Sequence, residues 1–459
     1  MSFSLSQRTK GISSVLSAII INIVCGSLYS WSGINGYYIS YLKNTGSPNV
    51  EIKDGYFFMP IITFSSMCFS PLVAIIDEKI GVKFVSLIST ILIIITNNFL
   101  YHSTNIFFIY GYMILYGFFN SMNYMPIIKN CLFYFPNKKG FINGFILFGY
   151  GTSSLIYNSI ADYLINPTYR QIDPNTGFFD KEITNNVKKY LIFFNFFSGI
   201  LSIFGFLILF EYKENETNNN CNEDNDNVND KNLKENLNES KVDSFTVKDA
   251  FYQAIKGIQL YQLWVMSTFL QIVSFTVTNT FRSFGQQCLM PEYFLSNLTK
   301  TYSVLNGLSR LIWGLLFDKF SFKYLYSVCI ITQVFVSSFI FFSVKYPILF
   351  FLLLCLQSIV VSGKISLNIT MFTKVYGIKH FSFIYSVSTA VGGFCHLLGP
   401  IIIKIVVKNL KDYEKLFIGG GICCIILEII LINFSEEPFK YKMNGGENEN
   451  ENGKELEEL

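Results

Sequence analysis

A few ionisable side chains stand inside long apolar stretches of the sequence. They are Arg310, Lys364, His396 and Glu428. A charge at bilayer depth costs about 2.5–3.5 kcal/mol on insertion scales, so such a group normally faces a cavity or a partner. The fork of a guanidinium also matches a carboxylate better than an ammonium does. Arg310 is therefore predicted to bind an anion. Lys364 either assists it or balances Glu428, and His396 either titrates near neutral pH or only packs.

The residue types needed for catalysis or metal binding do not come together in the sequence. It has no GxSxG, Walker or HExxH motif. The ten cysteines are scattered without a CxxC pair, and the three histidines are far apart. The net charge of +3 is not gathered into a basic patch, which argues against nucleic acid. We therefore expect no enzyme, no metal, no cofactor and no ATP-driven transport.

The composition predicts that most of the chain lies in lipid. Of 459 residues, 51% are apolar and only 15% are charged, against about 25% charged in soluble domains. A spanning helix needs about 20 mostly apolar residues. Twelve spans are predicted, over residues 12–41, 55–76, 84–101, 106–133, 140–165, 188–210, 260–282, 301–317, 323–344, 347–373, 380–406 and 414–434. The expected fold is an all-α membrane protein of twelve transmembrane helices, six on each side of a polar linker.

The polar linker lies in the middle of the chain. Within residues 217–240, ten of 24 residues are Asn and six are Asp or Glu, too polar a composition to order itself. The predicted organisation is an N-terminal six-helix bundle (1–211), a disordered cytoplasmic linker (212–258), a C-terminal six-helix bundle (259–435) and a disordered acidic tail (436–459).

A charged loop occurs twice, 240 residues apart, after the second and the eighth predicted spans. Its charged residues are Glu78, Lys79 and Lys83 in the first copy, and Asp318, Lys319 and Lys323 in the second. Internal repeats of this kind are how many transporters build alternating access. The two halves are therefore interpreted as structural repeats.

Twelve spans, a polar linker and this repeated loop together resemble the major facilitator superfamily. Three segments resemble a narrower group, the oxalate/formate antiporters and the related monocarboxylate porters. They are GSLYSWS at 26–32, FPNKKGFING followed by GYG within 135–151, and NGLSRLIWG at 306–314. The resemblance implies two six-helix bundles around a central cavity. It also implies that the loop charges latch the cytoplasmic ends of the helices.

The resemblance further implies that Arg310 holds a substrate carboxylate. Asn306 stands where the proton-coupled porters carry an Asp, and span 11 lacks the Lys of the oxalate exchangers. The missing Lys argues against oxalate as the substrate, and Asn306 leaves the usual proton-coupling pair incomplete. One central Arg balances one carboxylate, which favours a monocarboxylate.

Aromatic and amide side chains are further candidates for the cavity wall. Tyr29, Trp31, Asn123 and Tyr124 are expected to line it, because aromatic rings beside a cation can box a small planar anion. The alternative is that they only pack, since aromatic residues fill every span.

The predicted function is secondary transport of a small organic anion, most readily a monocarboxylate resembling pyruvate or lactate. Exchange and proton symport both remain open. The protein is expected to be a monomer with both termini in the cytoplasm, in the plasma membrane or an organelle membrane. One alternative keeps the fold but carries an amino acid or another small neutral metabolite. The other is a membrane sensor that does not transport.

Overall fold

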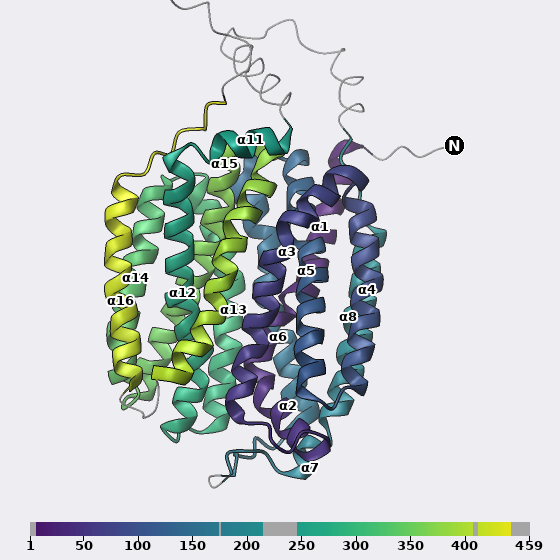
Figure 1. The fold of residues 1–459 in the computed structure, drawn as a ribbon, viewed down its shortest axis with the longest axis vertical. Coiled ribbons are helices and arrows are strands. Elements are labelled where there is room, and N and C mark those ends of the chain that lie inside the picture. Colours follow the sequence, from purple (N-terminus) through teal and green to yellow (C-terminus); the bar gives the residue numbers. More distant parts are fainter. Residues whose placement is uncertain (1–5, 174–175, 214–245, 407–411, 442–459) are drawn as a thin grey trace, which may run out of the picture.

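The computed structural model describes residues 6–173, 176–213, 246–406 and 412–441, and their regular structure is entirely helical (Figure 1). The helices are α1 (Gln7–Cys25), η1 (Gly26–Ser30), α2 (Trp31–Thr45), η2 (Ile52–Phe57), α3 (Phe58–Ile80), α4 (Val82–His102), α5 (Ile106–Tyr134), η3 (Pro136–Lys138), α6 (Lys139–Ile165), α7 (Lys181–Thr184), α8 (Val187–Leu207), α11 (Val247–Ala254), α12 (Ile258–Gln287), α13 (Glu292–Phe317), α14 (Phe322–Ser343), α15 (Pro347–Val406) and α16 (Asp412–Ile432).

The long helices account for the twelve predicted spans. The first span is α1, η1 and α2 in continuous succession, whereas α15 contains two spans that meet at Gly377. Gly377 has a φ of 76°, a conformation that glycine adopts readily and other residues rarely. Within the described ranges, eight helices are long and apolar enough to cross a membrane, and one of them, Pro347–Gly399, covers most of both halves of α15. The predicted all-α multi-pass membrane fold is confirmed.

Apolar side chains on the outside of the molecule agree with this environment. Phe107, Phe196, Ile348 and Ile429 are all exposed. Large exposed apolar surface is costly in water but matches lipid. The helices α5, α6 and α13 are not among these eight, and they bury polar residues such as Asn120, Asn143 and Arg310.

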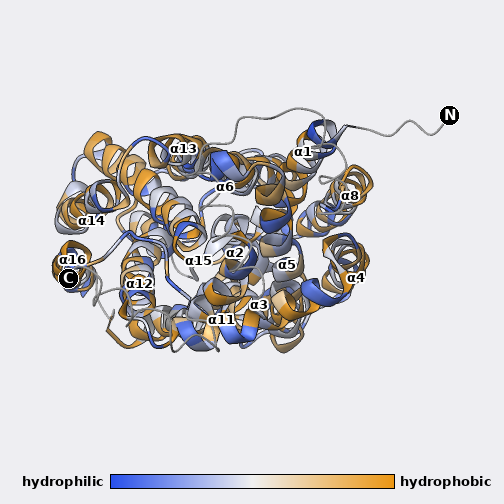
Figure 2. Ribbon diagram, turned by 90° about the horizontal axis from the view of Figure 1, so that it is seen from above, coloured by the Kyte–Doolittle hydropathy of each residue, from blue (hydrophilic) through white to orange (hydrophobic). Residues whose placement is uncertain are grey.

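The helices form two bundles that stand side by side, α1 to α8 in one and α12 to α16 in the other (Figures 1 and 2). The beginning of α1, the end of α16 and the short helix α11 lie at one end of the molecule, which we call the terminal side. The helix α7 lies at the opposite end, which we call the far side.

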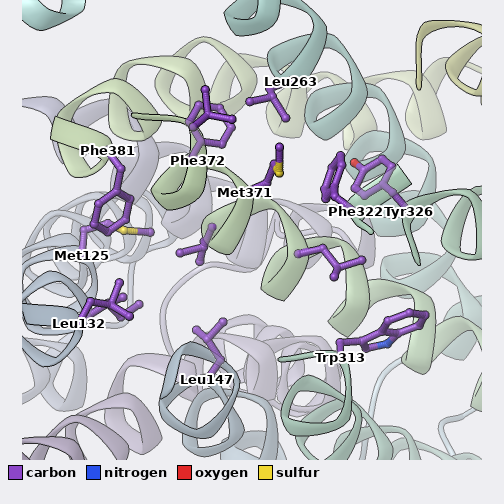
Figure 3. Close-up of a cluster of buried hydrophobic side chains, with 14 of the residues drawn as sticks. Met125, Leu132, Leu147, Leu263, Trp313, Phe322, Tyr326, Met371, Phe372 and Phe381 are labelled. Atoms are coloured by element: carbon purple, nitrogen blue, oxygen red, sulfur yellow. The ribbon is translucent and has the colours of Figure 1, made fainter. Parts of the chain in front are cut away.

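One hydrophobic cluster joins the two bundles on the terminal side. There, Leu132 and Leu147 of the N-terminal bundle share one cluster with Trp313, Phe372 and Phe381 of the C-terminal bundle (Figure 3). The other two clusters each belong essentially to one bundle, and only Phe275 crosses from the C-terminal bundle into the N-terminal cluster. The bundles are therefore closed against each other on the terminal side.

Glycines let α6 and α13 approach closely along the seam between the bundles. A Cβ added at Gly144 would lie 2.6 Å from the carbonyl oxygen of Arg310, and one at Gly151 would lie 2.6 Å from the Cα of Gly307. Small residues permit such contacts between membrane helices. On the opposite seam, α3 packs against α15, and the hydroxyls of Ser70 and Ser386 are hydrogen-bonded at 2.7 Å.

The linker and the tail are more structured at their edges than expected. Most of the predicted linker falls on residues 214–245, outside the described residues, but α11 lies within it and is capped by Thr246. At the beginning of the predicted disordered tail, Glu436 pairs with Lys374 at 3.2 Å, and the Phe439 N–H donates to the Val375 carbonyl at 2.8 Å. The aromatic ring of Phe439 gives this segment apolar surface to bury. The acidic composition of the tail as a whole did not indicate this.

Candidate functional site

Among the residues that the structure describes, Arg310 is the largest fully buried side chain, with 0% of its surface exposed. Its Nε donates a hydrogen bond to Asn306 Oδ1 at 3.0 Å. Its two terminal nitrogens have no hydrogen-bond partner among the described residues. An unpaired buried polar group is costly, and a guanidinium more so. The two nitrogens are therefore available to a ligand.

The register of α13 and the close approach of α6 place this side chain. Asn306 and Arg310 are four residues apart, so they share one face of the helix. Arg310 does not pair with Asp318 at the end of the helix. The Asp318 carboxylate instead accepts hydrogen bonds from backbone N–H groups of α6.

Aromatic rings surround the guanidinium. Its central carbon lies 5.2 Å from the ring centroid of Tyr150 and 5.8 Å from that of Tyr29. The two rings meet edge to face, with their centroids 5.4 Å apart. The ring of Tyr124 lies 5.1 Å from that of Tyr150, and the ring of Phe275 lies 6.4 Å from that of Tyr29, so both extend this wall. Tyr29 lies on η1, a short 3₁₀ turn inside the first span, and such turns often mark functional positions.

A cavity of about 80 Å³ adjoins these rings between the two bundles. Its wall combines aromatic rings with hydroxyl and amide groups. The residues lining it include Tyr29, Ser70, Tyr124, Tyr150, Gln271, Phe275, Asn368 and Tyr385. A mostly apolar wall with a few convergent polar groups is typical of a small-molecule site.

Lys364 and His396 lie on the C-terminal side of the same wall. The Lys364 ammonium donates to the Gln271 carbonyl at 3.4 Å and lies 4.9 Å from the centroid of the Phe275 ring. The side-chain amide of Gln271 is 2.9 Å from Nε2 of His396, and the imidazole meets Phe275 edge-on at 4.7 Å. Lys364 and His396 thus both contact Phe275 and Gln271, and the ring of Phe275 stacks on that of Tyr29.

The alternative partner of Lys364 was Glu428. The described part of the chain shows no carboxylate paired with Lys364. Glu428 instead accepts a hydrogen bond from the Ser327 hydroxyl at 2.5 Å. Lys364 is therefore a second fully buried basic side chain beside the cavity.

Two predicted residues lie elsewhere. Trp31 packs among Tyr38, Phe58 and Tyr112 in the core of the N-terminal bundle, and it does not line the central cavity. Asn123 is fully buried on α5 but is also absent from the cavity wall. Tyr150, Gln271, Phe275 and Tyr385 line the site without having been singled out. Tyr150 stands within the recognised segment 135–151, which was the available signal for it.

The second charged loop connects the two bundles on the terminal side. Asp318 follows α13, and its two carboxylate oxygens accept from the N–H groups of Gly140 at 3.1 Å and Phe141 at 3.0 Å. These N–H groups belong to the first turn of α6, where a helix has unpaired donors and favours negative charge. These hydrogen bonds connect the two bundles, as the predicted latch would.

The first charged loop is organised differently. Asp77 pairs with Lys129 at 3.2 Å within the N-terminal bundle. The carboxylate of the exposed Glu78 interacts electrostatically with Lys129 and Lys379. Lys379 follows Gly377 at the beginning of the second half of α15, so Glu78 faces the other bundle.

The lysines of the two loops lie around these contacts. Lys83 lies 5.9 and 5.8 Å from the ring centroids of Phe206 and Phe210, and the ammonium of Lys323 donates to the Ile432 carbonyl at 2.8 Å. Lys79 and Lys319 are exposed. A gating role for these residues stays a prediction.

Comparisons with known proteins agree with the fold. A family model described as Major Facilitator Superfamily matches residues 263–456. An Escherichia coli K12 protein named "Uncharacterized MFS-type transporter YhjX" is 27% identical over 160 residues, a match that covers 35% of this chain and 38% of that protein.

A solved structure shares the architecture over almost the whole length. It is a bacterial homologue of the iron transporter ferroportin in an outward-facing state with soaked iron. The TM-score is 0.61 at 10% identity, covering 92% of this chain and 98% of that one. At this identity the likeness extends to the fold alone. The chain is thus an integral membrane protein with the major facilitator fold, and its C-terminal part is similar in sequence to the major facilitator superfamily.

Proposed function

We propose that this protein is a secondary transporter of a small organic anion, most readily a monocarboxylate. The observation that carries the proposal is the buried guanidinium of Arg310, whose two terminal nitrogens have no partner in the described part of the chain. An anion that leaves water needs a compensating cation and hydrogen bonds. Two parallel N–H groups on one guanidinium match one carboxylate.

The surrounding rings support a small, partly apolar anion. Tyr29 and Tyr150 cover the guanidinium, and Tyr124 and Phe275 continue the wall, which leaves aromatic faces for a short carbon chain. Transport would proceed by rocking of the two bundles about this cavity. The glycine seam of α6 and α13 and the cap at Asp318 would be the contacts that open and close on the terminal side.

Labelled-substrate uptake into proteoliposomes tests the proposal. The panel is pyruvate, lactate, formate, oxalate, one amino acid and one sugar. Arg310→Ala should abolish carboxylate uptake, because truncating one partner of a desolvated charge pair costs about 2–5 kcal/mol. Arg310→Lys should bind the carboxylate measurably less well, since it keeps the charge but loses the fork. Lys345→Ala, at an exposed position between α14 and α15, is the matched control.

Three results would contradict the proposal. Carboxylate uptake by a well-folded Arg310→Ala protein at the wild-type rate would exclude the central guanidinium as the anion site. Uptake of the amino acid or the sugar in preference to carboxylates would favour a transporter of neutral metabolites. Binding of a carboxylate without any uptake would favour the sensor.

A further inference from the structure

A second and larger cavity lies between the bundles on the far side. Its volume is about 180 Å³, and its walls come from α2 and η2 of one bundle and from α12 and α13 of the other. A smaller cavity of about 30 Å³ shares Ser32, Thr278 and Phe281 with it. That smaller cavity also shares Tyr29 with the central cavity and includes Asn306, the partner of Arg310. The three cavities therefore follow one another from the far side toward Asn306 and Tyr29, which contact the guanidinium of Arg310.

Arg282 lines the larger cavity, and its guanidinium is held by two different acceptors. One terminal nitrogen, Nη2, forms an ion pair with Glu292 of α13, and Gln286 fixes the second carboxylate oxygen at 3.1 Å. The other, Nη1, donates to the backbone carbonyl of Gly33 at 3.1 Å. Only 13% of the Arg282 side chain and 2% of the Glu292 side chain are exposed.

The two acceptors differ in charge and in the bundle to which they belong. Glu292 is charged, buried and in the same bundle as Arg282, so it orients the guanidinium. The carbonyl of Gly33 is neutral and belongs to the opposite bundle. A carboxylate adds the attraction of a full negative charge to the guanidinium, which the neutral carbonyl lacks. An organic anion inside this cavity would therefore compete well for Nη1.

We propose that Arg282 is an outer anion site, at which a small carboxylate replaces the Gly33 carbonyl as the acceptor of Nη1. Because Gly33 lies on α2 and Arg282 on α12, the exchange removes a hydrogen bond between the bundles as the anion enters. Asn279 lines the same cavity, and its Oδ1 has no partner among the described residues, so it can accept a hydrogen bond from a ligand hydroxyl. The inference rests on the proposed transport of organic anions.

The test uses a double variant, Arg282→Gln with Glu292→Gln. Both charges are removed together, so no buried carboxylate is left without its partner. Lactate uptake is measured in proteoliposomes as a function of lactate concentration and of salt. Lys345→Gln changes the charge of an exposed far-side residue outside the cavity and is the matched control.

The double variant should raise the KM for lactate about tenfold, the loss expected for one hydrogen bond to a charged group. The maximal rate should change little, and the KM should become less dependent on salt, because the guanidinium that lines the cavity no longer attracts the anion. A KM equal to that of the wild type, or a lowered maximal rate with an unchanged KM, would overturn the outer site and make Arg282 a structural contact.

The outer site and the proposed function fail in different ways. If Arg310→Ala abolishes lactate uptake while the Arg282 and Glu292 double variant behaves like the wild type, the outer site is wrong and the transport function stands. If the wild-type protein transports no member of the carboxylate panel, the proposed function is wrong, and the proposal of an outer site is wrong as well.

Discussion

The Asp318 carboxylate, at the end of α13, accepts a hydrogen bond from the backbone N–H of Gly140 at the beginning of α6, 3.1 Å away. The two residues belong to different bundles and are 178 positions apart. A loop charge of one bundle therefore serves as the N-terminal cap of a helix in the other. Any movement that separates the bundles on the terminal side must break this cap.

Asp318→Asn should shift the protein away from the state that is closed on the terminal side. The neutral amide loses the interaction between a negative charge and a helix N-terminus, worth about 0.3–1 kcal/mol, or up to roughly fivefold in the equilibrium. We expect the maximal rate of transport to fall while the affinity for substrate is retained. Uptake kinetics check this, with Lys345→Gln at an exposed position outside the two charged loops as the control. A collapse in affinity with normal turnover would place Asp318 in the binding site.

Gly140→Ala should disturb the same closure by steric means. A Cβ at Gly140 would collide with the Gly314 carbonyl and would lie 2.6 Å from Asp318 Oδ1. Overpacking of this kind costs about 1–3 kcal/mol. We expect a lower thermal midpoint and slower transport. Gly111→Ala is the matched control, because a Cβ there meets nothing within 4 Å. Equal effects of the two substitutions would show that helix propensity, and not the seam, is responsible.

Lys364→Met should leave stability unchanged or raise it, because it removes a buried cation that has no carboxylate partner in the described ranges. Lys129→Met is the contrasting variant, since it leaves the mostly buried Asp77 without its partner and should destabilise the protein. Thermal unfolding in detergent compares the two. Uptake adds a second distinction. A mild effect on lactate fits an accessory cation, whereas a loss as severe as that of Arg310→Ala would indicate a substrate with two carboxylates.

Deleting residues 217–240 should leave the transport rate per folded molecule close to that of the wild type. The deleted stretch is rich in Asn and acidic residues and is expected to form no part of the cavity. Surface expression and uptake are measured together. A large loss of transport with normal membrane insertion would contradict this interpretation of the linker.

The sequence predicts the helices well where apolar runs are uninterrupted, and poorly where buried charges interrupt them. The eighth span is predicted to begin at residue 301, but α13 begins at Glu292. Its first part carries Glu292 and Lys300, which are paired with Arg282 and Asp162. These partners come from other helices, so the sequence gives no sign that the charges are neutralised.

Arg310 could be singled out because one charge among apolar residues is conspicuous, whereas its aromatic neighbours could not. Because the chain contains 48 Phe and 28 Tyr, nothing in the sequence distinguishes Tyr150 and Phe275 from the aromatic residues that only pack. Trp31 shows a second limit. It follows Tyr29 by two positions, and residues so spaced on a helix point to different faces. Tyr29 therefore reaches the guanidinium while Trp31 packs into its own bundle.

The division of the hydrophobic core has a consequence for assembly. Two clusters belong essentially to one bundle each, whereas on the terminal side Leu132 and Leu147 share a cluster with Trp313 and Phe372 of the other bundle. Each half of the chain, synthesised alone, would bury its own cluster and leave an uncovered apolar face on the terminal side. Two separate polypeptides cut within residues 217–240 should accordingly recombine in one membrane, because that face is most stable against its natural complement.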